Sequence, residues 1–193
     1  MIVFDMDNTI NDWTANVYYR LVARESMAEL ETVHHFIRPL LDRLDKGGIT
    51  LSQFENRIAR RFKVPKARIN YFKCYKKTVH VRPGMIRLVK HLKQRYQMAL
   101  MTNSERTRYA YTAKTINLKI FDYTFVSEYT HLIKPNMNAY ANVIKKTGTM
   151  PSEMLLIDDK MENVIVARRA GMKAIRFVGE RELRQQLERM DIL

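Results

Sequence analysis

The chain has 193 residues, of which 46% are hydrophobic, so it can bury the core of one good-sized domain or of a domain with a smaller insert. A single cysteine, Cys74, excludes an internal disulfide and a zinc site built on several cysteines, and it favours a reduced, cytoplasmic setting. The 34 Lys and Arg residues exceed the 20 Asp and Glu residues, giving a net charge of +14 that makes nucleic acid an alternative partner, although no nucleic-acid-binding motif stands out. No run approaches the roughly 18 apolar residues of a membrane helix.

The chain opens with a short buried strand that ends in two acids. Ile2, Val3 and Phe4 lead directly into Asp5, and Asp7 follows two positions later. Two carboxylates this close repel each other, and in a site of low dielectric one of them would take up a proton. A bound cation, a reacting group, or both would account for the pair.

Residues 14–79 have a helical pattern and contain no predicted strand. Apolar residues recur at steps of three and four through residues 14–45, where Pro39 is expected to kink or divide the helix and Gly47-Gly48 to end it. A further helix is predicted in TLSQFENRIARRF, capped by Thr50 or Ser52, and a shorter one follows Pro65. This stretch is too long for a plain crossover. It is therefore predicted to be a helical insertion that covers one edge of a sheet, with joints near residues 12–15 and 78–82.

From residue 80 onwards the predicted helices and strands alternate. Strands are expected at residues 97–103, 121–128, 153–159 and 173–178, and helices at residues 82–96, 104–117, 136–148, 161–171 and 179–193. Alternation of this kind implies parallel pairing of the strands. The predicted fold is α/β: a three-layer, Rossmann-like parallel-sheet core from residues 1–13 and 80–193, with an all-helical cap insertion at residues 14–79.

Polar residues follow four of these strands, where ligands of parallel sheets bind. They are Asp5, Asp7, Asn8 and Thr9, then Thr102, Asn103 and Ser104, then Lys134, and finally Asp158 and Asp159. Acidic oxygens from two strands suit Mg²⁺ better than zinc, and the cation would let neighbouring carboxylates stay ionised. An ionised aspartate can attack a phosphoryl group to form an aspartyl-phosphate, and the second acid can protonate the leaving oxygen and then activate water. Thr102 and Lys134 would stabilise the phosphoryl oxygens.

These motifs resemble the haloacid dehalogenase-like (HAD) superfamily of aspartate-nucleophile phosphohydrolases. The resemblance rests on FDMDNT, ALMTNS, IKPN and LLIDD, each placed after a predicted strand, and it spans Ile2 to about Phe177. The stretch ENVIVARRAGMKAIRF is also similar to the one found in many members with a helical cap.

The resemblance implies roles for the acids of the first and last motifs. Asp5 would be the nucleophile and a Mg²⁺ ligand, while Asp7 would be the acid/base and would give its backbone carbonyl to the metal. Asp159 would bind the metal directly and Asp158 would support it. Dehalogenases of the superfamily lack an acid at the position of Asp7, so the sequence looks like a phosphatase or a phosphomutase. Asn8 stands where Gly is frequent, but Asn also tolerates unusual backbone angles.

The resemblance also implies a phosphate-binding set of Thr102, Asn103 and Lys134, with Asn163 as a supporting group. The predicted function is that of a Mg²⁺-dependent phosphoric monoester hydrolase acting on a small phosphorylated metabolite. The alternatives are a phosphomutase with the same nucleophile, and a basic nucleic-acid-binding protein or nucleic-acid end phosphatase. Four residues where the insertion meets the core are further candidates to face a substrate: Trp13, Tyr18, Tyr19 and Arg20.

Overall fold

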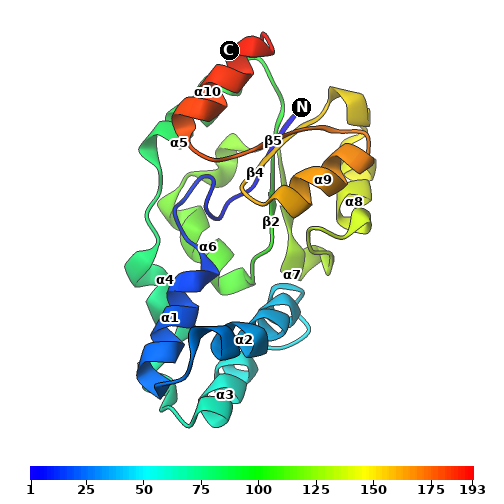
Figure 1. The fold of residues 1–193 in the computed structure, drawn as a ribbon. Helices are drawn as coiled ribbons and strands as arrows, with labels where there is room; N and C mark the ends of the chain where they lie inside the picture. The colour runs from blue at the N-terminus through cyan, green and yellow to red at the C-terminus, as the bar shows by residue number, and fades with distance from the viewer.

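Five parallel strands form one sheet through the centre of the molecule in the computed structural model, which describes residues 1–193 (Figure 1). Its strands are β1 (Ile2–Phe4), β2 (Met98–Thr102), β3 (Tyr123–Val126), β4 (Leu155–Asp158) and β5 (Lys173–Arg176), in the spatial order β3-β2-β1-β4-β5. All four strand pairs are parallel. The predicted α/β class and its strands are therefore confirmed. The predicted strand at 121–128 ends early, because Ser127–Thr130 form the short helix α7.

Both faces of the sheet are covered by helices, which makes three layers (Figure 1). Successive strand residues point to opposite faces: Ile2 and Phe4 belong to one hydrophobic cluster and Val3 to another. The first cluster packs under α5 (Pro83–Leu92), α6 (Arg106–Thr115) and α10 (Glu180–Arg189). The second packs under α8 (Met137–Thr147) and α9 (Met161–Arg169). Apolar burial on both faces explains why the strands read as continuous hydrophobic runs.

The strand order changes direction at β1. The next two strands, β2 and β3, lie on one side of β1, and the last two, β4 and β5, lie on its other side. The carboxyl ends of β1 and β4 consequently lie side by side at a switch point, where open parallel sheets bind their ligands. The backbone N–H of Asp5 donates to the carbonyl of Ile157 at 2.9 Å, which fixes Asp5 next to Asp158.

The insertion between β1 and α5 is all-helical. It contains α1 (Ala15–Ser26), α2 (Leu30–Asp45), α3 (Leu51–Phe62) and α4 (Tyr71–Thr78), which pack around a separate hydrophobic core of 17 buried residues. Aromatic edges hold this core together, with ring centroids 4.9 Å apart for Trp13–Tyr75 and 4.8 Å for Tyr18–Tyr71.

The insertion lies beyond the carboxyl ends of the strands and not along an edge of the sheet as expected (Figure 1). The reason is local, since the chain enters the insertion directly from the carboxyl end of β1. The entering and returning segments run side by side: Asp12 N–H donates to the His80 carbonyl at 3.0 Å, and Arg82 N–H donates to the Ile10 carbonyl at 2.9 Å. Asn11 and Val81 form an antiparallel bridge between them.

The helical stretch 14–45 is divided at Met27 and not at Pro39. Met27 has a left-handed backbone, with a φ of 57°, and ends α1. Pro39 lies inside α2, which continues through it. A proline removes one helical N–H, but Pro39 and His35, four residues earlier, are both exposed, so water can bond the freed carbonyl. At the start of α3, Thr50 and not Ser52 forms the cap, in a capping box with Gln53. No helix in the chain is both long and apolar enough to cross a membrane.

Candidate active site

A buried lysine ties the ends of β1 and β4 together. Lys134 Nζ donates to Asp5 Oδ1 at 2.7 Å and to Asp158 Oδ2 at 2.6 Å, and the Lys134 residue is only 3% exposed. Burial alone would lower the pKa of Lys134, but Asp158 and Asp5 outweigh it and raise that pKa, so the ammonium stays charged. Asp5, Lys134 and Asp158, which are far apart in the sequence, therefore meet at the switch point of the sheet, where parallel sheets bind their ligands.

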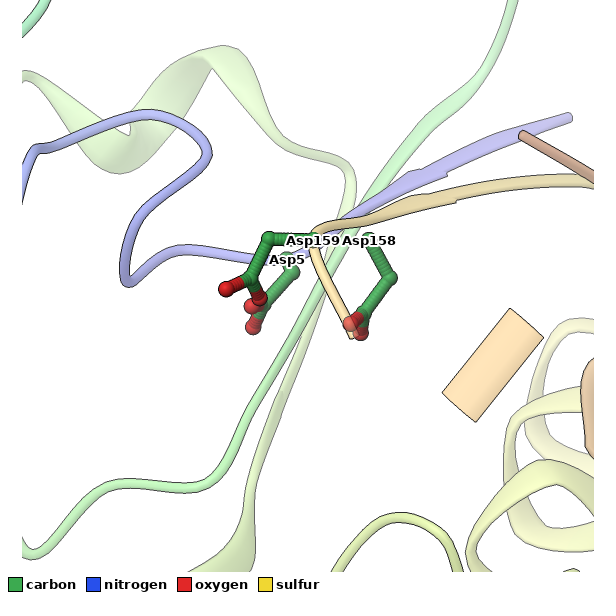
Figure 2. Close-up of side chains that lie close together, drawn as sticks. All are labelled: Asp5, Asp158 and Asp159. Atoms are coloured by element: carbon green, nitrogen blue, oxygen red, sulfur yellow. The ribbon is translucent and has the colours of Figure 1, made fainter. Parts of the chain in front are cut away.

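Three carboxylates gather around this lysine. Ligand oxygens of Asp5, Asp158 and Asp159 lie within 4.8 Å of one another at the ends of β1 and β4 (Figure 2). Burial raises the pKa of Asp5 to about 8, with Lys134 opposing the shift and Asp158 and Asp159 adding to it. One lysine does not neutralise three acids, so the site has an excess of negative charge.

The donor set fits a hard divalent cation. Asp159 Oδ1 is buried and has no hydrogen-bond partner, while Asp159 Oδ2 accepts from Asn8 Nδ2 at 2.9 Å. Both oxygens of Asp158 are taken: Oδ1 accepts from Lys160 N at 2.9 Å and from Asn163 Nδ2 at 2.8 Å, and Oδ2 accepts from Lys134. A metal ion would find a free oxygen on Asp159 and a supporting residue in Asp158.

The loop after β1 brings Asp7 to the same place. Asp7 Oδ1 accepts from Asn11 Nδ2 at 3.0 Å, and Asp7 Oδ2 accepts from Arg108 Nη1 at 2.8 Å. Asn8 turns the chain with a φ of 57°, the left-handed conformation that asparagine tolerates better than most residues. The same side chain reaches Asp159, so this residue serves both the turn and the acid cluster.

Two neighbouring residues at the carboxyl end of β2 differ in what they bond. Thr102 is buried, and its Oγ1 has no hydrogen-bond partner. The side chain of Asn103 bonds the backbone of Lys134 twice: Asn103 Nδ2 donates to the Lys134 carbonyl at 2.8 Å, and Asn103 Oδ1 accepts from the Lys134 N–H at 2.9 Å. Asn103 therefore holds Lys134 in position, while Thr102 keeps a free hydroxyl.

Sequence reasoning missed Arg108 and Asp45. Arg108 on α6 is 2% exposed and bonds Asp45 Oδ1 through Nη2 at 2.6 Å, besides its bond to Asp7. Asp45 is the last residue of α2, and burial raises its pKa to about 7 against the opposing effect of Arg108. The sequence offered no signal for this pair, because 62 residues separate the two and Arg108 is one of several basic residues after β2.

A cavity of about 290 Å³ lies between the core and the insertion. The cavity is lined by Asp5, Asp7, Asn103, Lys134 and Asp159 on the core side and by residues of α1 and α2 on the opposite side. Of the aromatic candidates, Trp13 and Tyr19 line this cavity. Tyr18 lies in the core of the insertion, where its hydroxyl donates to the Ile69 carbonyl at 2.8 Å, and Arg20 lines a different groove.

Similarity to known proteins agrees with this arrangement. The profile of the haloacid dehalogenase-like hydrolase family matches residues 2–177. The chain belongs to this family. A HAD family enzyme from Bacteroides thetaiotaomicron has the same fold, with a TM-score of 0.78, 17% sequence identity and 91% of each chain covered. That enzyme is also known in complex with magnesium and inorganic phosphate, where the TM-score is 0.75 and the identity 18%, over 91% of this chain and 92% of that one.

The HAD family includes proteins of different activity among the relatives of this chain. The L-2-haloacid dehalogenase of Xanthobacter autotrophicus gives a TM-score of 0.65 at 16% identity, covering 100% of this chain and 83% of its own. A sesquiterpene phosphatase of Aspergillus oryzae is 40% identical over 53 residues, which are 28% of this chain and 27% of that protein. The match thus spans about a quarter of this curated relative.

Proposed function

We propose that this protein is a Mg²⁺-dependent phosphoric monoester hydrolase that works through an aspartyl-phosphate on Asp5 and acts on a small phosphorylated metabolite. The observation that carries the proposal is the convergence of Asp5, Asp7 and Lys134 on one polar cavity, with Asp159 beside them. Asp5 and Asp159 would hold Mg²⁺, with the backbone carbonyl of Asp7 as a further ligand and Asp158 in support. The ion would neutralise the excess of carboxylate charge and the charge of the phosphate.

The first half of the reaction forms a bond to Asp5. A carboxylate oxygen of Asp5 attacks phosphorus, and the bond between phosphorus and the ester oxygen breaks with its electron pair going to that oxygen. The carboxyl group of Asp7 gives its proton to the departing oxygen. Lys134 and the Thr102 hydroxyl donate to the phosphoryl oxygens while charge builds up on them.

The second half restores the enzyme. Asp7, now a carboxylate, takes a proton from water as the water oxygen attacks phosphorus. The bond between Asp5 and phosphorus breaks, and inorganic phosphate and the Asp5 carboxylate are released. The presence of an acid at position 7 supports phosphoryl transfer over dehalogenation, because a carbon–halogen bond needs no proton on its leaving group.

Residues 14–79 are proposed to act as a cap over the remaining core of residues 1–13 and 80–193. The paired segments around Asn11 and Val81 are the only two chain crossings between these parts, so they are the natural hinges. Closure would exclude bulk water while the phosphoryl group moves to Asp5.

The test is a screen of phosphorylated metabolites and an aryl phosphate with Mg²⁺ present. Wild-type protein is expected to release phosphate, and Asp5→Asn or EDTA to abolish release. Activity that survives both changes would contradict the mechanism. Measuring isomer formation beside phosphate release separates a hydrolase from a phosphomutase, and salt-dependent retention of Asp5→Asn on DNA would favour the nucleic-acid alternative.

A further inference from the structure

Arg108 joins the core to the insertion at the proposed acid/base. Its Nη1 donates to Asp7 Oδ2 at 2.8 Å and its Nη2 to Asp45 Oδ1 at 2.6 Å. Asp7 belongs to the loop after β1 in the core, whereas Asp45 ends α2 in the insertion. One buried guanidinium therefore spans the boundary between the two parts.

The insertion surrounds the guanidinium on more than one side. The Cζ atom of Arg108 lies 5.5 Å from the ring centroid of Tyr71 and 5.7 Å from that of Tyr75, both on α4. Such faces attract a cation and shield it from water. On the core side the only other hydrogen bond of the guanidinium is to the Asn103 carbonyl, 3.3 Å from Nη2. With the insertion displaced, Arg108 would lose Asp45 and both rings together.

The contact with Asp7 fixes the direction of a carboxylate that must face the ester oxygen. Asp7 Oδ1 is held by Asn11 at 3.0 Å, which leaves Oδ2 to Arg108. The planar fork of an arginine sets both the distance and the angle of its partners, which a lysine does not. An Arg108 without its contacts from the insertion would be free to swing away from Asp7.

We propose that Arg108 is a positioning residue that makes the orientation of Asp7 depend on docking of the insertion, through Asp45, Tyr71 and Tyr75. This inference rests on the proposed phosphohydrolase function. Proton transfer from Asp7 then becomes efficient only when the cavity is closed. The insertion thereby contributes to the chemical step from outside the catalytic core.

The leaving group distinguishes this role from a purely structural one. A p-nitrophenolate leaves without a proton, whereas an alkoxide needs one from Asp7. A misplaced Asp7 should therefore slow phosphoryl transfer from an alkyl phosphate more than from p-nitrophenyl phosphate. The ratio of the two kcat/KM values reports phosphoryl transfer to Asp5, because kcat/KM includes only the steps up to and including the first irreversible one.

The experiment compares Arg108→Met, Arg108→Lys, Asp45→Ala and Asp45→Asn, each with Mg²⁺ on both substrates. Arg106→Met is the matched control, because Arg106 lies two residues away on α6, is exposed, and pairs with Glu128 outside the cavity. Arg108→Met is expected to lose about 10- to 100-fold more kcat/KM on the alkyl phosphate than on the aryl phosphate. Asp45→Ala should change the ratio in the same direction although Asp45 does not touch Asp7, and Asp45→Asn, which keeps an oxygen for Nη2, should recover part of it.

Thermal unfolding of every variant guards against a folding defect. If Arg108→Met does not fold, the Asp45 pair decides the question. Variants that fold and keep the wild-type ratio of the two substrates would overturn the proposal, as would a control that changes this ratio as much as Asp45→Ala. Wild-type protein that is inactive on both substrates would instead refute the proposed hydrolase function, so the two failures are distinct.

Discussion

Thr102 has a buried hydroxyl with no partner at the end of β2, and it is one of the residues proposed to bind phosphate. A buried polar group without a hydrogen bond costs about 1–3 kcal/mol, whereas the same group bonded to a charged ligand contributes about 1.5–3 kcal/mol. We expect Thr102→Val, which keeps the shape of the side chain, to weaken inhibition by inorganic phosphate about 10- to 100-fold. Its stability should stay equal or rise slightly. Phosphate inhibition in the presence of Mg²⁺ and unfolding in urea measure the two effects.

Thr112 provides the control for that substitution. It is equally buried, but its Oγ1 lies 2.5 Å from the Tyr75 hydroxyl. Thr112→Val would leave the Tyr75 hydroxyl unpaired and should lower stability by about 1–3 kcal/mol. The same chemical change is thus expected to have opposite effects on stability at the two positions. A loss of stability in Thr102→Val as large as in Thr112→Val would show that the Thr102 hydroxyl has a partner in the protein.

The acid cluster predicts a pH dependence in the metal-free protein. Burial raises the pKa of Asp5 from 3.8 to about 8, so between these values the folded protein binds one proton more than the unfolded chain. Stability in EDTA should therefore fall as the pH rises from about 4 to 8, by the linkage between proton binding and folding. Mg²⁺ binds the ionised form and should raise the melting temperature more at pH 8 than at pH 5.5. Asp5→Asn should flatten both dependences, and an equal Mg²⁺ effect at the two pH values would argue against Asp5 as a ligand.

At the scale of elements, α3 gives a direct test of local stability. Thr50 and Ser52 are both suitable caps by composition, but only Thr50 bonds the N–H of Gln53, at 3.2 Å. Ser52 Oγ is exposed and accepts from Lys66 Nζ at 3.3 Å. Thr50→Ala should lower the free energy of unfolding by about 1 kcal/mol, while Ser52→Ala should change it by less than about half of that. Equal losses in urea titrations would mean that α3 begins at a different residue in solution.

The sequence predicted the elements whose cause is local. Runs such as Met98–Met101 read as strands because both faces are buried, and the acids that end β1 and β4 mark the switch point. The break at Met27 was not foreseen, since methionine has no preference for the left-handed conformation that ends α1. The pairing of Arg108 with Asp45 was hidden for a different reason. It depends on how the insertion sits on the core, and that tertiary placement leaves no periodic pattern in the chain.

The whole molecule places a helical insertion over the carboxyl ends of a parallel sheet (Figure 1). The nucleophile and metal-site residues come from the sheet, and the opposite wall of the cavity comes from α1 and α2. That wall contains Asn16, Tyr19, His34, Arg38 and Asp42. Only four of the 19 lining residues of the cavity are hydrophobic, so the cavity as a whole offers mainly hydrogen bonds and charges. Those four, Trp13, Ala15, Tyr19 and Leu41, all lie on the side of the insertion.

The predominantly polar lining of the cavity predicts a preference for small, polar leaving groups. An isoprenoid chain gains binding energy only by leaving water for apolar surface, at about 25 cal/mol per Å², and it would here desolvate Arg38 and Asp42 without bonding them. A polyol or sugar phosphate can bond these groups and fits better into a cavity of about 290 Å³. We expect kcat/KM for glycerol phosphate to exceed that for farnesyl monophosphate by at least about 10-fold. A series of linear alkyl phosphates isolates the effect of apolar length. If kcat/KM rises steadily with chain length, the substrate lies outside this polar cavity and the proposed closure over a small metabolite is wrong.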